Sequence, residues 1–110
     1  MKWLSRKEEF ILLAVTYLAE DAYGVSIREY LVRMTGRYWS IGATYDVLDR
    51  LTRKGCLVST DAEPTPERGG KSKRYYRITD KGHKALVELQ KMHKALLTNG
   101  LKSVPKTGET

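Results

Sequence analysis

The segment from Ser40 to Thr79 constrains the fold more than any other part of the chain. It begins with apolar residues at helical spacing, and this pattern ends at Gly55. A short apolar run follows, and then comes a loop rich in proline and glycine, which cannot continue a strand. The return run is basic and contains Tyr75 and Tyr76. A helix followed by a basic β-hairpin can place one element in a DNA groove and lay the other along the phosphates.

The residues before this segment predict two more helices. Ser5 and Glu8 have the spacing of a capping box, in which both side chains accept hydrogen bonds from free N–H groups of the first turn. Apolar residues then recur at helical spacing until Glu20-Asp21 ends the helix. A second helix opens at Tyr23-Gly24, and Gly36 suits a left-handed stop at its end.

The third helix is predicted to begin after Ser40, a favourable N-cap residue, and to end at Lys54-Gly55. Its inward stripe is expected to consist of Tyr45, Leu48 and Leu51, with Val47 beside them. The polar residues expected on its other faces are Thr44, Asp46, Asp49, Arg50 and Arg53.

Two strands and a fourth helix complete the pattern. The strands are predicted over residues 57–60 and 75–78, with a hairpin loop over residues 63–70. Thr79 caps the fourth helix, and Gly100 is expected to end it. The chain therefore divides into a winged helix-turn-helix DNA-binding domain at 1–79, a C-terminal dimerisation helix at 80–99 and a disordered tail at 100–110. The predicted fold class is α+β and mostly α, with three helices, a two-stranded wing and the dimerisation helix.

Composition narrows the class of protein. The 110 residues contain 20 Lys and Arg against 13 Asp and Glu, and the basic excess is concentrated between Arg68 and Arg77, where no acidic residue occurs. Such a local excess is typical of nucleic-acid binding. The single Cys56 fits a reducing cytoplasm, and we expect a cytoplasmic, nucleoid-associated protein without a membrane span or signal peptide. Two histidines and one cysteine argue against a metal site, and no residue pattern indicates a cofactor or an enzyme.

Four short motifs, in order, resemble the PadR family of bacterial transcriptional regulators. They are Tyr23-Gly24-x-x-Ile27, Gly42-x-x-Tyr45-x-x-Leu48-x-Arg50-Leu51, Gly55-x-Leu57 and Lys73-Arg74-Tyr75-Tyr76-x-Ile78-Thr79-x-x-Gly82. No single motif is specific, but the series is. The resemblance implies a homodimeric winged-helix repressor that binds a palindromic operator in double-stranded DNA and that a small ligand can release. The short C-terminal part resembles the compact branch of the family. Thr44, Thr52 and a lysine-rich wing depart from the family pattern.

The DNA contacts are predicted on the third helix and the wing. The candidate residues are Ser40, Gly42, Thr44, Tyr45, Arg50, Arg53, Arg68, Lys71, Lys73 and Arg74. Small residues at the start of the helix let its N-terminus approach a phosphate closely. The resemblance implies that Tyr45 keeps its ring inward and its hydroxyl near a phosphate. The alternatives are that Tyr45 is a core residue with an exposed tip and that the wing is only a solvated, charged loop.

The fourth helix carries one apolar stripe, which we expect to form a dimer seam with the first helix of a partner. The predicted seam residues are Phe10, Leu13, Tyr17, Leu86, Leu89, Met92, His93 and Leu96. Alternatively, this helix folds back on its own core. His93 is expected to be a hydrogen-bonded interface residue. A small aromatic or hydrophobic effector could stack on Trp3 or Trp39, although Trp39 fits better as a core residue.

These patterns predict a sequence-specific DNA-binding transcriptional regulator. The alternative is a winged-helix module whose main partner is another protein. The regulator hypothesis places a sequence-reading helix beside a phosphate-binding wing, so the two elements should affect binding in different ways.

Overall fold

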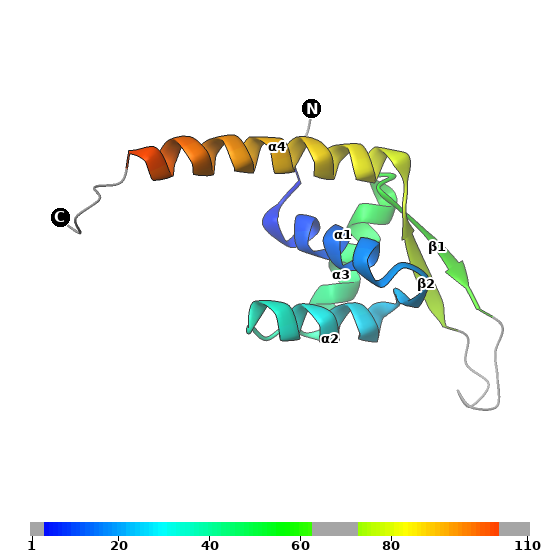
Figure 1. Cartoon of the computed structure of the whole chain (residues 1–110). Coiled ribbons are helices and arrows are strands. Elements are labelled where there is room, and N and C mark those ends of the chain that lie inside the picture. Colours follow the sequence, from blue (N-terminus) through cyan, green and yellow to red (C-terminus); the bar gives the residue numbers. More distant parts are fainter. Residues whose placement is uncertain (1–3, 63–72, 104–110) are drawn as a thin grey trace.

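The computed structural model describes residues 4–62 and 73–103. Figure 1 shows three helices gathered beside a two-stranded sheet, with a long fourth helix across one side. The elements in chain order are α1 (Arg6–Leu18), α2 (Gly24–Thr35), α3 (Ile41–Arg53), β1 (Leu57–Asp61), β2 (Arg74–Ile78) and α4 (Asp80–Lys102), and a 3₁₀ turn over Ala19–Asp21 joins α1 to α2. This order confirms the predicted winged helix-turn-helix with an additional C-terminal helix. The predicted hairpin loop, the wing residues Arg68 and Lys71, Trp3 and most of the predicted tail lie outside the described residues.

The core lies where α1, α2 and α3 meet the start of β1. Its fully buried members include Ile11, Leu12, Ile27, Leu48 and Leu57. Burying a side chain of this size contributes about 1.5–3 kcal/mol. Cys56 belongs to the same core. Trp39 is also buried there, which confirms its interpretation as a core residue.

The predicted helix starts are confirmed by their capping hydrogen bonds. Ser5 and Glu8 form a capping box at the start of α1. The hydroxyl of Ser40 accepts a hydrogen bond from the Ala43 N–H (3.0 Å), and the hydroxyl of Thr79 accepts one from the Gly82 N–H (3.1 Å). Each such cap stabilises its helix by about 1 kcal/mol.

Two helix ends differ in how well the sequence predicted them. Gly36 ends α2 in the left-handed conformation (φ 67°), as predicted. The predicted end of α4 was wrong, because the helix continues through Gly100 to Lys102. A glycine inside a helix costs about 1 kcal/mol, but it ends the helix only where the backbone turns left-handed.

The buried face of α3 differs from the predicted inward stripe. Thr44 is fully buried together with Val47, Leu48 and Leu51, whereas Tyr45 is 40 % exposed. The Thr44 hydroxyl donates a hydrogen bond to the Ser40 carbonyl (2.9 Å), so this polar group needs no water. The prediction that Thr44 lies on another face and contacts DNA was therefore wrong, because its side chain does not reach the surface.

The two strands of the wing are attached to the helices at one end of the sheet. Strands β1 and β2 are antiparallel, and Leu57 pairs with Ile78 at the end nearest the core. On its other edge β2 is joined to the residues before α2: Tyr23 forms an isolated bridge with Tyr75, and the Tyr76 N–H donates to the Ala22 carbonyl (2.8 Å). This bridge fixes the base of the wing relative to the start of α2.

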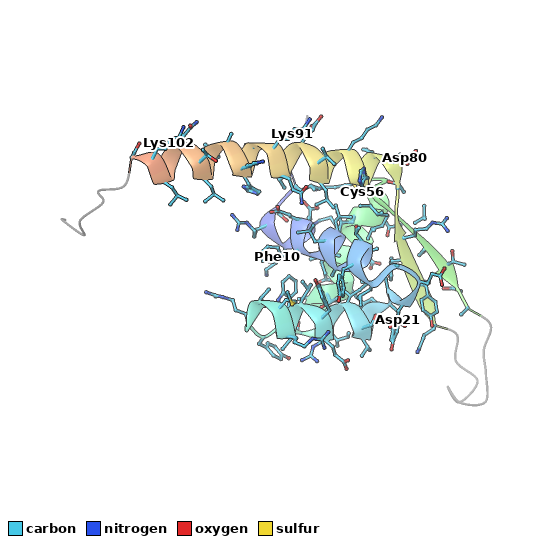
Figure 2. All side chains as sticks on the ribbon, viewed as in Figure 1. Phe10, Asp21, Cys56, Asp80, Lys91 and Lys102 are labelled. Carbon is cyan, nitrogen blue, oxygen red and sulfur yellow. The ribbon has the colours of Figure 1, made fainter. Side chains whose placement is uncertain are left out.

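The first and second halves of α4 have different surroundings. Leu86 belongs to the chain's own core, and Leu89 is also buried within this chain. Their burial corrects their assignment to a seam between two chains. Leu96, Leu97 and Leu101 are each more than 60 % exposed. Figures 1 and 2 show this second half extending away from the other described elements. No described helix is long and apolar enough to cross a membrane.

Candidate nucleic-acid interface

Tyr45 joins the outer side of α3 to the start of α2. Gly24 is buried beneath its ring, and a Cβ atom at position 24 would overlap the Tyr45 side chain. The tyrosine hydroxyl consequently lies at the N-terminal end of α2, where free N–H groups favour an anion. The close packing of Gly24 on Tyr45 brings residues of two of the sequence motifs into contact.

Lys73 lies at the base of the wing, over one ring of a packed pair of tyrosines. Its Nζ atom lies 4.0 Å from the centre of the Tyr23 ring. The Tyr23 and Tyr75 rings meet edge to face with their centres 5.6 Å apart. A cation over an aromatic face is stabilised by about 0.5–1 kcal/mol at an exposed site. The lysine charge is therefore held beside the start of α2 rather than left to move freely.

Arg74 has a carboxylate partner across the hairpin. Its Nε atom donates to the Asp61 carboxylate at 3.1 Å, and these two residues are also paired in the strand register. The hydrogen bond to Asp61 raises the pKa of Arg74. Both side chains are more than half exposed, so this pair is weak and Arg74 can exchange its carboxylate for a phosphate.

Tyr76 lies beneath the wing and next to α3. Its side chain is 3 % exposed, and its hydroxyl has no hydrogen-bond partner within the described residues. Burial raises the pKa of Tyr76, and the nearby carboxylate of Asp49 raises it further, while Arg74 opposes the shift. An unsatisfied buried hydroxyl costs about 1–3 kcal/mol.

The remaining predicted residues of α3 differ in accessibility. Gly42 and Arg53 are exposed, and a Cβ atom at position 42 would point into open space. Asp46 and Asp49 are exposed on the same outer side. This outer side can therefore approach another molecule without rearrangement.

Arg50 contacts the Glu8 carboxylate of its own chain, and the sequence did not indicate this contact. The buried carboxylate of Glu8 accepts hydrogen bonds from Lys54 Nζ (2.6 Å) and Arg50 Nε (3.3 Å) through one oxygen. Its other oxygen accepts from the Ser5 N–H (2.8 Å). Arg50 therefore anchors α3 on α1, while its side chain remains 45 % exposed and its DNA contact stays a prediction.

The pKa of Glu8 is lowered despite burial. Burial by itself raises it, but the hydrogen bonds and charges of Lys54, Ser5 and Arg50 together outweigh this effect. Glu8 therefore remains ionised as the common partner of two cations from α3. The capping-box spacing identified this glutamate as a helix cap, but nothing in that spacing indicated its contact with α3.

The neighbouring Glu9 connects α1 to α4. Its carboxylate oxygens lie 3.2 and 3.3 Å from His93 Nε2, and Glu9 is itself 6 % exposed. His93 is therefore hydrogen-bonded, as predicted, but to its own chain. Other predicted seam residues also have partners in their own chain: the Phe10 ring is 6.5 Å from Trp39, and Tyr17 stacks on Tyr30 at 4.7 Å. Of the predicted seam residues on α1, Leu13 and Tyr17 are exposed.

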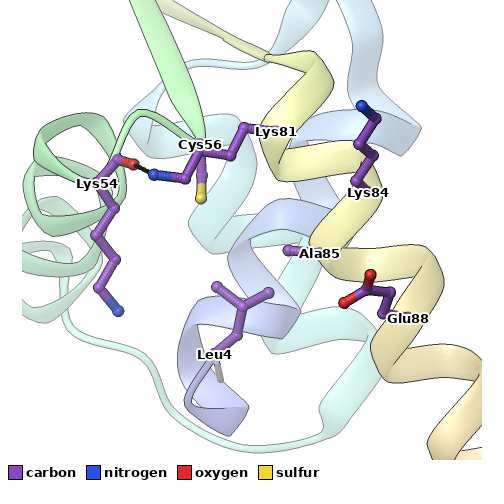
Figure 3. A pocket seen from close by; sticks show the side chains of 7 residues that line it. All are labelled: Leu4, Lys54, Cys56, Lys81, Lys84, Ala85 and Glu88. Atoms are coloured by element: carbon purple, nitrogen blue, oxygen red, sulfur yellow. Dashed lines mark hydrogen bonds between the residues drawn. The ribbon is translucent and has the colours of Figure 1, made fainter. Parts of the chain in front are cut away.

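A cavity of about 640 Å³ lies where the end of α3 meets the start of α4 (Figure 3). Leu4, Cys56 and Ala85 form its apolar wall. Lys81 crosses one side and donates a hydrogen bond to the Lys54 carbonyl at 2.7 Å. The cavity therefore borders the contact that connects the end of α3 to α4.

Comparison with known proteins identifies the family. The PadR-like family of transcriptional regulators matches residues 12–88, which include α2, α3, both strands and the first part of α4. The chain belongs to the PadR-like family. No curated protein sequence matches it.

Solved structures of other PadR proteins have the same fold. A PadR family transcriptional regulator from Eggerthella lenta is 27 % identical, with a TM-score of 0.68, and the alignment covers 94 % of this chain and 87 % of that one. A PadR-like transcription factor from Bacteroides fragilis is 26 % identical, with a TM-score of 0.71, over 90 % and 93 % of the two chains. These relatives are transcriptional regulators and not enzymes, and the same class applies to this PadR-like chain.

Proposed function

We propose that this PadR-like protein is a sequence-specific repressor that binds a palindromic operator as a homodimer. The observation that carries the proposal is the exposed outer side of α3, flanked by Tyr45 and by the basic base of the wing. An exposed helix of this kind can enter the major groove, about 12 Å wide, and read base edges there. Lys73 and Arg74 can then contact the phosphates alongside it.

The homodimer is supported by the second half of α4. Leu96, Leu97 and Leu101 form an exposed apolar surface that the described part of the chain does not cover. Contiguous exposed apolar surface marks an interaction site in a water-soluble domain. Pairing two chains along α4 provides two copies of α3, as a palindromic operator requires.

Release by a small aromatic or hydrophobic effector is part of the same proposal. The cavity between α3 and α4 supports it, because its wall is mainly apolar and its volume of about 640 Å³ suits a small molecule. A ligand there would act on the contact between Lys81 and the carbonyl of Lys54 at the end of α3. Movement of α3 would then weaken operator binding.

An electrophoretic shift assay tests the proposal. The probe is the DNA upstream of the protein's own gene, the control is a scrambled duplex of equal length and composition, and the assay is repeated at two salt concentrations. We expect a selective shift whose affinity falls steeply with salt. If the two duplexes shift alike at low salt, the protein is not a sequence-specific repressor, and a winged-helix module for protein partners becomes the better hypothesis.

A further inference from the structure

A second basic surface lies on the side of α3 away from the wing. It is a cavity of about 740 Å³ between the start of α1, the turn joining α2 to α3, and the first turn of α3. We call it the flank groove. Its lining includes three cations and three aromatic residues and no acidic residue: Arg6, Lys7, Arg37, Phe10, Tyr38 and Trp39. A surface that combines cations and aromatic rings without a carboxylate has the composition of a nucleic-acid contact.

The cations of the flank groove are available to an external anion. Lys7 and Arg37 are exposed, and neither has a carboxylate partner among the residues that the structure describes. Arg6 forms only a long contact with Glu9 (3.7 Å) and is 69 % exposed. Together they give this side of the molecule a positive charge that internal ion pairs do not neutralise.

The turn between α2 and α3 presents its aromatic residue in a defined position. Tyr38 is 79 % exposed, and the guanidinium of Arg28 lies 5.5 Å from the centre of its ring. The same guanidinium donates a hydrogen bond to the Trp39 carbonyl. This hydrogen bond connects the turn to α2. Arg37 and Tyr38 therefore lie on a segment that is held in place next to the N-cap of α3.

The flank groove and the wing lie on opposite sides of α3. Ala43 lines the flank groove, whereas Tyr45 packs on the start of α2 beside the wing. Residues two apart on a helix point in nearly opposite directions, because each residue advances the helix by about 100°. A helix in a major groove has a sugar-phosphate strand on each side, and the wing with the start of α2 can contact only one of them.

We propose that the flank groove contacts the second DNA strand, with Arg37, Lys7 and Arg6 binding its phosphates and Tyr38 packing against a sugar. This inference rests on the proposed operator binding and extends it to residues outside α3 and the wing. Recognition helix α3 is thereby held from both sides. The contacts are to the backbone, so they position α3 without reading sequence.

The test compares two double variants of the full chain that lose the same charge. Lys7→Gln with Arg37→Gln removes two cations from the flank groove, and Lys91→Gln with Lys102→Gln removes two exposed cations from α4. Operator affinity is measured by fluorescence anisotropy at four salt concentrations, with circular dichroism to confirm equal folding. We expect the flank-groove variant to lose roughly tenfold or more in affinity at about 0.1 M salt. The slope of log K against log salt should fall by about 3.6, which is about 0.9 for each of the four cations that a dimer loses. The α4 variant should match the wild type.

A footprint on the same complexes locates the lost contacts. Ethylation interference should show wild-type contacts with phosphates on both sides of the major groove, and the flank-groove variant should lose those opposite the wing. Equal slopes and equal footprints for wild type and flank-groove variant overturn the inference while leaving operator binding intact. If the wild type itself binds operator and scrambled DNA alike, the proposed function is overturned as well.

Discussion

At the scale of single residues, Glu8 has two structural roles, and its position in the sequence indicates only the first of them. One oxygen caps α1 and the other binds Lys54 and Arg50 at the end of α3. A buried carboxylate is stable only when it is paired in this way. Glu8 therefore contributes to the position of α3 although it is far from this helix in sequence.

Replacing Glu8 by glutamine should destabilise the fold. The amide keeps the shape but leaves Lys54 and Arg50 without their anion. Breaking a fully buried pair costs about 3–5 kcal/mol, and because these two cations are 30 % and 45 % exposed we expect a smaller loss of about 1–3 kcal/mol. Urea unfolding measures it. Glu88→Gln, at an exposed position on α4, is the matched control and should change the free energy of unfolding little.

The pKa of Glu8 also predicts a dependence of stability on pH. Its pKa is lowered in the folded state, so its contribution is present above the ordinary carboxyl pKa and is lost as the pH falls through the folded value. The free energy of unfolding of the wild type should therefore fall on acidification below about pH 4.5, and that of Glu8→Gln should fall less steeply. Parallel pH profiles for the two proteins would show that Glu8 is not the group responsible.

Gly24 and Gly42 should respond in opposite ways to alanine. At Gly24 a Cβ atom would displace Tyr45, so Gly24→Ala should destabilise the fold by about 1–3 kcal/mol. At Gly42 the space is open and the backbone is helical, so Gly42→Ala should stabilise it by up to about 1 kcal/mol. Thermal unfolding of both variants decides the matter, and a harmless Gly24→Ala would contradict the packing of Tyr45 on α2.

At the scale of elements, the wing and α3 are expected to serve different purposes. The base of the wing presents cations that are held by Tyr23 and by Asp61. The outer side of α3 presents Asp46, which can accept a hydrogen bond from cytosine in the major groove. Phosphate contacts strengthen binding to every sequence, whereas base contacts discriminate among sequences.

Variants of the two elements should separate affinity from specificity. Lys73→Glu with Arg74→Glu should weaken binding to operator and scrambled DNA by similar factors. Asp46→Asn should instead change the preference between operators that differ at one base pair, by about 1–3 kcal/mol at the base it contacts. Competition shift assays with single-base operator variants measure both effects. If the two variants behave alike, α3 is not the reading element.

At the scale of the whole molecule, α4 combines an internal and an external role. Its first half packs Leu86 and Leu89 in the chain's own fold, and Glu9 binds His93 further along. Its second half exposes Leu96, Leu97 and Leu101. A helix anchored at one end and apolar at the other can hold a second copy at a fixed orientation.

Charge on this apolar surface should disrupt the dimer. We expect Leu97→Lys to increase the dimer dissociation constant at least tenfold, because a lysine at a buried interface position loses apolar burial and adds an unpaired charge. Sedimentation equilibrium measures the change. Ala95→Lys adds the same charge at an exposed position on the opposite side of α4 and should leave the dimer intact. A monomeric wild type would contradict the proposed assembly.

Much of the fold could be predicted from the sequence because its signals are local. Capping residues, left-handed glycine and hydrophobic spacing act within a few residues, so Ser5, Ser40, Thr79 and Gly36 took the predicted roles. The candidate interface was predicted less well. Thr44 shares the inward helical spacing of Val47, Leu48 and Leu51, but its polar side chain favoured an outer position in the prediction. Its hydroxyl bonds to the Ser40 carbonyl, which allows a polar residue to be buried there.

The sequence by itself determined the order of elements, the basic wing and the membership of a regulator family. Only the tertiary structure decided which side of each helix faces water and which charges are already paired. Glu8 with Arg50 and Lys54, Glu9 with His93, and Gly24 with Tyr45 are contacts between residues distant in the chain. The physical reason is that pairing and burial depend on which elements meet in space, and no local spacing carries that information.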